Sequence, residues 1–397
     1  MKRRTFLKNT SLASTTFMVP SFLKNFQKKQ HFSSRAGKIL VVVQLSGGND
    51  GLNTIIPYQN DIYYKSRPNL GIPKNEVLKI TDDLGWNPAM SAMRPLYDKG
   101  LLSIVNNVGY PNPDRSHFRS MDIWHTASDS DKYLESGWIG RYLDSNCQTC
   151  TPYSALELDD SLSLALKGKA SNGFAMKNPK QLKKMTDNRL LKAFGQQEHD
   201  HDHEEVAYLY KTLIDTQSSA DYLFQQSKVY TSKVSYPNTA FGKDLKQTAE
   251  LITADTDTQV YYLSLSGFDT HANQKNTQER LLKQYAEGME AFVDDLRQNN
   301  LLNDTLILTF SEFGRRVGQN ASNGTDHGTA NNLYLIGGNL KNPGFYNEGP
   351  DLTKLDKGDL IYKVDFRNVY ATVLNQWLDA DAPAILGKKF DLLHMLG

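Results

Sequence analysis

Short, continuously apolar runs recur along this chain and alternate with longer amphipathic segments. The runs lie at 38–46, 101–109, 259–265 and 305–310, and in NLYLIGG at 332–338. They are rich in β-branched residues, which is typical of parallel strands that are buried on both faces. Helical periodicity fills 240–254, 274–298 and the closing FRNVYATVLNQWL. This alternation predicts a doubly wound α/β fold, with a mostly parallel sheet and helices on both faces.

The middle of the chain lacks the alternation. Between about 150 and 235 it reads as polar helices and loops, with QLKKMTDNRLLKAF and EEVAYLYKTLIDT the most periodic pieces. We therefore expect a helical insertion there, within one α/β domain that spans 37–397. The tract EHDHDHEE at 198–205 resembles a metal-binding segment, but acidic residues at the start of a helix explain it better.

The first residues form a segment of their own, which we expect to be an export signal and linker at 1–36. Arg3 and Arg4, in MKRRTFLK, precede the mild apolar stretch SLASTTFMVPSFL, and together they resemble a twin-arginine signal. The stretch is too short and too interrupted to span a membrane. We expect the twin-arginine translocase as a partner and a periplasmic or extracellular location.

Composition excludes some classes of protein. With 45 Lys and Arg against 44 Asp and Glu, the formal charge of +1 offers no field for nucleic acid. The two cysteines, Cys147 and Cys150, cannot form a tetrathiolate zinc site within one chain. The pair is interpreted as incidental or structural, with a local disulfide left open.

Residues of the metal-ligand type follow the predicted strands, in SGGNDG, SGFDTH, FSEFG and TDHG. They are Asp50, Asp269, His271, Glu312, Asp326 and His327. Each segment alone also fits turn or helix-capping chemistry. As a set, they should converge in one crevice, because parallel strands end at one edge of their sheet. We expect one or two divalent ions, zinc or manganese first, with magnesium or calcium as alternatives.

A helix start should face the same crevice. PNPDRSHF at 111–118 passes from turn residues into a helix whose first turn would hold Ser116 and His117. Amides at such a terminus favour an anion and help a hydroxyl to ionise. His117, Arg119 and Arg315 are candidate contacts for an anionic ester, since guanidinium groups match phosphate or sulfate oxygens. Arg315 fits an ordinary surface charge equally well.

Longer motifs carry a resemblance to a known family. They are SGGNDGLNTIIPY, RSHFRSMDIWHTA, GWIGRYLD, DTHANQ, SEFGR, DHGTAN and DFRNVYATVLNQWL. Together they resemble an uncharacterised family of twin-arginine-exported bacterial proteins, domain of unknown function 1501, over nearly the whole mature chain. That family is grouped with the alkaline phosphatase and sulfatase superfamily. The resemblance implies an alkaline phosphatase-like core and a divalent-metal site for hydrolysing phosphate or sulfate esters.

The resemblance also assigns roles to single residues. Asp50 corresponds to a metal-holding aspartate after the first strand, and Asp269 with His271 to an Asp–His pair of wider spacing. His327, after Asp326, resembles a late histidine before glycine. Glu312 and Phe313 stand where many members have Asp-His, so one imidazole of a two-metal site is missing.

The implied nucleophile is Ser116, at the start of the helix after an early strand, with Ser120 as a fallback. Ser116 also suits a plain N-cap. The sequence thus predicts an exported metal-dependent hydrolase that acts on a small anionic ester or on a sulfated or phosphorylated glycan. The alternative is a non-catalytic, metal-stabilised periplasmic binding or assembly protein with a degenerate site. A metal-free serine hydrolase is disfavoured, because the chain lacks a G-x-S-x-G elbow.

Overall fold

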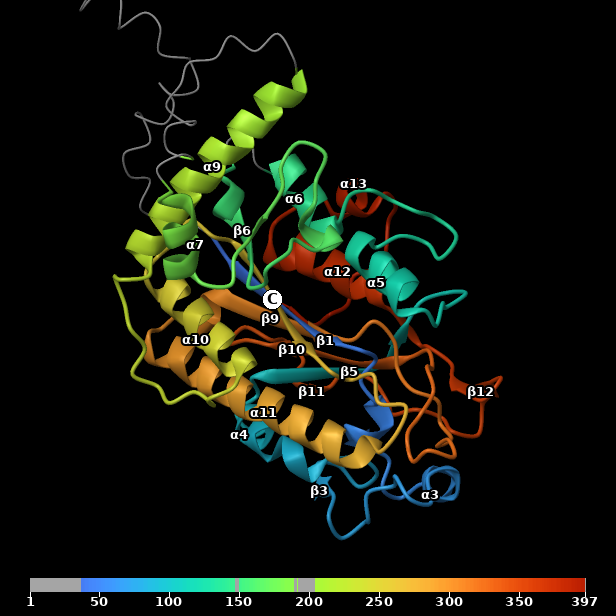
Figure 1. The fold of residues 1–397 in the computed structure, drawn as a ribbon. Helices are drawn as coiled ribbons and strands as arrows, with labels where there is room; N and C mark the ends of the chain where they lie inside the picture. Colours follow the sequence, from blue (N-terminus) through green and yellow to red (C-terminus); the bar gives the residue numbers. More distant parts are fainter. Residues whose placement is uncertain (1–36, 147–149, 189–190, 192–203, 397) are drawn as a thin grey trace, which may run out of the picture. The chain divides into compact units, whose positions relative to one another are not determined.

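The computed structural model describes residues 37–146, 150–188, 191 and 204–396 (Figure 1). The predicted export signal at 1–36, Cys147 and most of EHDHDHEE lie outside these residues. Cys150 is disulfide-bonded. No helix of the described ranges is both long enough and apolar enough to cross a membrane.

A central sheet runs through this part of the molecule. Its order is β11 (Gly344–Phe345), β5 (Leu102–Gly109), β10 (Asn331–Ile336), β9 (Thr305–Phe310), β1 (Ile39–Ser46), β8 (Val260–Ser266), β6 (Ala155–Glu157) and β7 (Phe174–Ala175), and β14 (Val364–Asp365) also pairs with β5. All neighbours are parallel except β10, which runs antiparallel to both β9 and β5. The predicted fold class, α/β with a mostly parallel sheet, is confirmed.

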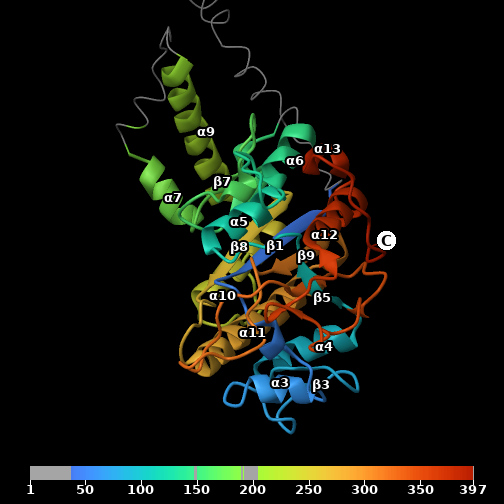
Figure 2. The same cartoon turned by 90° about the vertical axis from the view of Figure 1, so that its right-hand side faces the viewer.

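Helices cover both faces of the sheet (Figures 1 and 2). One face packs against α10 (Ala240–Thr253) and α11 (Gln274–Gln298), together with Val41 and Val43 of β1. The other face packs against α5 (His117–Thr126), α6 (Trp138–Asn146), α12 (Phe366–Thr372) and α13 (Ala382–Leu386), with Leu40 and Val42 of β1. Alternate side chains of β1 therefore enter two different cores, which explains why its apolar run is continuous.

The long helices follow from their apolar spacing. In α11, Leu281, Tyr285, Met289, Phe292 and Leu296 recur at intervals of three or four residues and are all buried. The bounds of α11 match the predicted 274–298. The predicted final helix divides, because α12 passes at Val373 into a π-helical turn that ends at Trp377.

The stretch from 150 to 235 contains helices, as expected, and also extends the sheet. Its helices are α7 (Pro179–Thr186) and α9 (Glu204–Gln226). Its strands, β6 and β7, were not expected, because two or three residues are too few for a periodic pattern. β6 pairs with β8 through Leu156 and Tyr261, so this stretch adds two strands at one edge of the sheet.

Smaller elements lie around the ends of the strands. A separate sheet joins β2 (Ile55–Ile56), β4 (Gly85–Trp86) and β3 (Leu78–Lys79), near α3 (Asp61–Ser66) and α4 (Arg94–Asp98). β12 (Leu355–Asp356) and β13 (Asp359–Leu360) form a short hairpin.

The topology decides which loops meet. β1, β5, β8 and β9 are parallel, so all four end at the same edge of the sheet, whereas the antiparallel β10 begins there. The loops that follow the four strands and the loop that precedes β10 therefore share this edge. These loops carry most of the residues that the sequence marks as functional.

Candidate metal centre

Arg315 ties three of these loops together. Its guanidinium donates to the carbonyl oxygens of Gly48 at 2.7 Å, Phe268 at 2.9 Å and Thr325 at 2.9 Å. The side chain is fully buried and also bonds Asp269 Oδ1 at 2.9 Å. Arg315 was predicted to contact substrate. The structure instead commits its donors to the protein, where they hold the loops in register.

Gly47 permits the close approach of two loops. Its φ of 116° lies in the region that L side chains rarely adopt, and a Cβ here would collide with the backbone of Phe268 and Asp269. The Gly47 amide donates to Glu312 Oε1 at 2.8 Å. The glycine thus places a carboxylate beside the Asp269 loop.

Three imidazoles surround one carboxylate oxygen. The Nε2 atoms of His271, His327 and His117 lie 3.0, 3.1 and 3.3 Å from Asp269 Oδ1. The Nε2 atoms of His271 and His327 are themselves 2.9 Å apart. Since these residues come from the loops after β8 and β5 and before β10, the sheet edge brings together side chains that are far apart in sequence.

The other nitrogen of each ring faces an oxygen that can only accept. His117 Nδ1 lies 2.9 Å from Glu312 Oε1, and His327 Nδ1 lies 2.7 Å from the carbonyl oxygen of Arg115. His271 Nδ1 faces Asp326 Oδ1 at 3.4 Å. An Nδ1–H in each ring would satisfy these oxygens, so Nε2 is the ring nitrogen that each histidine turns toward Asp269. This is the arrangement in which metal-binding histidines are oriented by oxygen acceptors.

The charges of the group follow from its surroundings. Burial opposes ionisation of Asp269, but hydrogen bonds from Arg315 and His327 outweigh it and hold the pKa of this carboxyl well below its usual range. Burial lowers the pKa of His327, which favours the neutral ring. The hydrogen bond to Glu312 raises the pKa of His117. The group thus combines an ionised carboxylate with at least one neutral imidazole.

These residues fit a divalent cation. His117, Asp269 and His327 each offer a ligand atom within 4.8 Å of the others. Nε2 of His117 is buried and makes no hydrogen bond among the described residues. Imidazole with carboxylate is a donor set that zinc and manganese accept.

The six predicted ligands fall into two groups and one exception, Asp50. The structure brings together Asp269, His271 and His327 around one point. It places Glu312 and Asp326 behind the imidazoles of His117 and His271, where their oxygens orient the rings.

Asp50 differs from the other predicted ligands. Its Oδ2 is 2.6 Å from Arg67 Nη1 and also accepts from Gln274. Both partners of this ion pair are almost fully buried. The structure thus gives Asp50 a protein cation as its partner, and the group within 4.8 Å does not include it.

The two remaining anion-binding candidates change role. His117 was predicted to contact substrate, but it lies among the ligand atoms; its position at a helix start on the same sheet edge was the available signal. Arg119 is buried, donates to the carbonyls of Asp129, Ser130 and Lys132, and stacks on Tyr133. Its guanidinium is therefore used inside the protein.

Ser116 precedes α5 as its N-cap and is exposed. Its hydroxyl makes no capping hydrogen bond. It stands between Arg115, whose carbonyl binds His327, and His117, so the backbone places it beside the centre. Ser120, the fallback, is fully buried, and its hydroxyl donates to the carbonyl of Asp114 at 2.8 Å. Ser120 is thus not accessible to a substrate.

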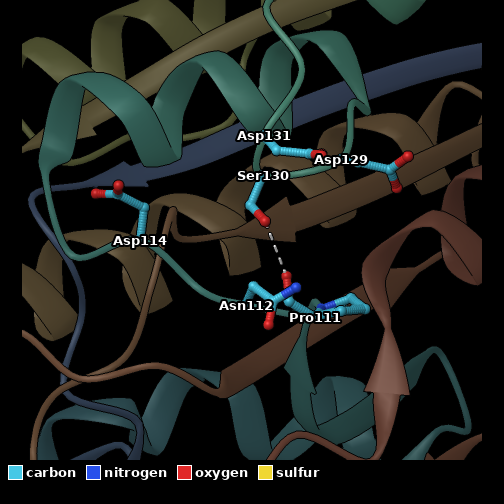
Figure 3. Close-up of a pocket in the computed structure, with 6 residues that line it drawn as sticks. All are labelled: Pro111, Asn112, Asp114, Asp129, Ser130 and Asp131. Carbon is cyan, nitrogen blue, oxygen red and sulfur yellow. Dashed lines mark hydrogen bonds between the residues drawn. The ribbon is translucent and has the colours of Figure 1, made fainter.

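A hollow of about 350 Å³ lies beside the segment that leads to Ser116 (Figure 3). Its lining residues are Pro111, Asn112, Asp114, Asp129, Ser130 and Asp131. The Ser130 hydroxyl donates to the carbonyl of Pro111 at 3.2 Å, which ties the two sides together. Three carboxylates in this lining make it a poor match for an anionic ester.

The chain belongs to the family described as "Protein of unknown function (DUF1501)", whose model matches residues 37–382. No curated protein matches it. Among solved structures, the C-terminal periplasmic domain of EptC from Escherichia coli, in complex with Zn, is 11% identical at a TM-score of 0.38, covering 78% of this chain and 74% of that one. A sulfatase from Pseudoalteromonas sp. is 11% identical at a TM-score of 0.39, covering 95% and 76%.

A third structure is described as a protein in the alkaline phosphatase superfamily from Vibrio parahaemolyticus. It is 10% identical at a TM-score of 0.41, covering 89% of this chain and 69% of that one.

Proposed function

We propose that this family member is an exported metal-dependent hydrolase of phosphate, sulfate or related anionic esters. One observation carries the proposal: three imidazole Nε2 atoms converge on Asp269 Oδ1, while each Nδ1 is held by an oxygen acceptor. Such pre-oriented rings are expected where a protein holds a catalytic cation. A purely structural cluster would not need three ring nitrogens gathered on one carboxylate oxygen.

The ion would be held by His117, His327 and Asp269. His271 would lie next to His327, since their Nε2 atoms are 2.9 Å apart. A divalent ion bound there would act as a Lewis acid on an ester oxygen and lower the pKa of a nearby hydroxyl or water. Glu312 and Asp326 would keep the rings of His117 and His271 in the required orientation. Arg315 would fix Asp269, because its buried guanidinium leaves that carboxylate little freedom to rotate.

Ser116 is the proposed nucleophile. Its hydroxyl is exposed at the first turn of α5, where backbone amides favour a developing negative charge. The absence of a capping hydrogen bond leaves the oxygen available for attack on the phosphorus or sulfur atom of an ester. The hydroxyl and the imidazole of His117 are neighbours in sequence, so one helix start positions both.

The test is Ser116→Ala in protein purified from its native host. We expect metal content to stay parental and the free energy of unfolding to fall by no more than about 2 kcal/mol, since even loss of a true N-cap costs no more than this. Hydrolysis of 4-nitrophenyl phosphate or 4-nitrophenyl sulfate should fall by orders of magnitude. Parental rates would contradict the role of Ser116 and point to water as the attacking group.

Export is proposed from Arg3 and Arg4, in residues that the structure does not describe. The twin-arginine translocase carries folded proteins, which suits a chain that acquires its metal in the cytoplasm. We expect the double variant Arg3→Lys/Arg4→Lys to accumulate in the cytoplasm, because the receptor reads guanidinium groups. Cell fractionation checks this, and undiminished periplasmic accumulation would refute it.

A non-catalytic, metal-stabilised binding or assembly protein is the second candidate. The observation that favours it is the internal use of Arg119 and Arg315, which removes two predicted contacts to an anionic ester. Elemental analysis combined with the ester assays separates the two readings. Bound metal without hydrolysis of any phosphate or sulfate ester would support this second function.

A further inference from the structure

Arg115 and Arg316 form a guanidinium pair at the edge of the metal centre. Arg115 Nη2 and Arg316 Nε both approach the carboxylate of Asp359, the latter at 3.8 Å. Asp359 is 1% exposed, whereas the arginine side chains are 38% and 37% exposed. The carboxylate of Asp359 thus lies between two guanidinium groups that solvent can reach.

Both arginines are attached to the centre through their backbones. The carbonyl of Arg115 accepts the hydrogen bond from His327 Nδ1 at 2.7 Å. The amide of Arg316 donates to the carbonyl of Asp326 at 3.0 Å. The pair therefore lies on the His327 side of the ligand group.

The pair also keeps unused hydrogen-bond donors. Among the described residues, Arg115 Nε is buried without a partner. In the described part of the chain, the Arg316 guanidinium makes a hydrogen bond only to the carbonyl of Lys357, at 3.5 Å. Arg67 and Arg315, by contrast, are fully buried and donate to several oxygens each. Of these four arginines, Arg115 and Arg316 are the ones whose side chains are partly exposed, so a ligand can reach them.

We propose that Arg115 and Arg316 bind a tetrahedral oxyanion of the substrate, phosphate or sulfate. Guanidinium groups match such oxygens in paired, charge-assisted hydrogen bonds. Asp359 would hold the two side chains at the spacing that one oxyanion needs. The inference rests on the proposed function, and it names the residues that would select an anionic ester there.

The test is calorimetric titration of the full chain with inorganic phosphate and with inorganic sulfate. Arg316→Ala should weaken binding of at least one anion by about tenfold, since a hydrogen bond to a charged group contributes about 1.5 kcal/mol or more. Arg316→Lys should restore part of the affinity. Arg94→Ala, which removes an exposed, Asp98-paired arginine of α4, is the matched control and should leave binding unchanged.

Removing Arg115 alone would strand the buried Asp359, so the second variant is Arg115→Met/Asp359→Asn. It should weaken anion binding by about tenfold as well, with metal content unchanged. Unchanged affinity in this variant and in Arg316→Ala, or no anion binding by the parent, would overturn the proposal.

Repeating the titrations on metal-loaded and metal-stripped protein separates two sources of the oxyanion. Arginine-dependent binding that requires metal would identify the scissile group. Arginine-dependent binding without metal would identify a second anionic group, as on a multiply sulfated or phosphorylated glycan. If the parent binds the anions through these arginines but hydrolyses no ester, the proposed hydrolase activity fails and the binding site stands.

Discussion

Two regions at the same sheet edge each contain an aspartate, but the two aspartates differ in burial and in the residues around them. In the first, the Asp50 region, Asp50 is closed in with Arg67, Asn53, Gln274 and Gln278. In the second, the Asp269 region, Asp269 meets His117, His271 and His327. The side chain of Asp50 is 1% exposed and that of Asp269 is 48% exposed.

The regions differ in what balances the negative charge. Arg67 supplies a full positive charge to Asp50, and it also donates to Asn53 and to the carbonyls of Val317 and Arg316. Around Asp269, three rings turn Nε2 toward the carboxylate, and Arg315 adds a guanidinium at 2.9 Å. Asp50 thus has a fixed cation of the protein beside it, whereas the Asp269 region gathers the ring nitrogens that the proposed metal ion would use. An aspartate after a strand can therefore belong to either kind of region.

The largest expected effect is on metal binding by Asp269→Asn. An amide oxygen is a weaker ligand than a carboxylate, and its nitrogen would turn donors toward the rings. We expect metal affinity to fall by more than about 100-fold, beyond the loss typical of residues that only orient ligands. Elemental analysis and competition with a chelator would measure it. If the Asp269→Asn variant kept one metal ion per chain, Asp269 would not be a metal ligand and would not differ from Asp50 in this respect.

Asp50→Asn should act on stability instead. It leaves Arg67 buried without a countercharge, and breaking a buried ion pair costs about 3 to 5 kcal/mol. Denaturant unfolding should show this loss, while metal affinity of the folded protein stays near the parental value. Asp61→Asn, on the exposed helix start of α3, is a control that should change neither property. Loss of metal with unchanged stability would restore Asp50 as a ligand.

A smaller effect is expected from Glu157, a buried carboxylate without an arginine. Burial raises its pKa to about 7, and the Ser163 amide, which donates to its Oε2 at 2.6 Å, offsets only part of this. The unfolded chain then ionises near pH 4.5 while the folded protein stays protonated. The stability contribution of Glu157 is thus complete below pH 4.5 and falls by about 2 to 3 kcal/mol as the pH rises through 7.

Glu157→Gln should remove this pH dependence. The variant should be close to the parent at pH 5 and more stable than the parent at pH 8, as measured by thermal or urea unfolding. Equal pH profiles for the two proteins would mean that burial alone does not explain the shift. In that case, burial without an arginine would not raise the pKa of a carboxyl here, and the contrast with Asp50 and its partner Arg67 would be weaker.

The sequence predicts the sheet well because its strands are buried on both faces. β9 lies at the predicted 305–310, and α11 at the predicted 274–298. β6 and β7 were missed because their pairing partners, and not their own two or three residues, make them strands. The π-helical turn after α12 likewise carries no periodic signal.

For the site, the sequence predicts which segments meet, but it does not predict which side chains face the centre and which ones form ion pairs or orient the rings. Asp269, His271 and His327 come together as expected from strand ends that share one edge. Arg67 could not be anticipated as the partner of Asp50, since it follows no strand and belongs to no motif. The role of His117 depends on a ring orientation that Glu312 sets across 195 residues.

The place of β1 in the sheet has a consequence for how the molecule assembles. β1 is the first strand of the described residues, yet it lies between β8 and β9, which begin at Val260 and Thr305. During synthesis, the centre of the sheet cannot close until the chain beyond Phe310 has left the ribosome. Pairings this distant in sequence form slowly, because a long loop must close before any contact compensates its entropy. The sheet therefore closes late in synthesis, and the candidate ligand atoms stay far apart along the nascent chain until the segments through β9 and the loop before β10 have emerged.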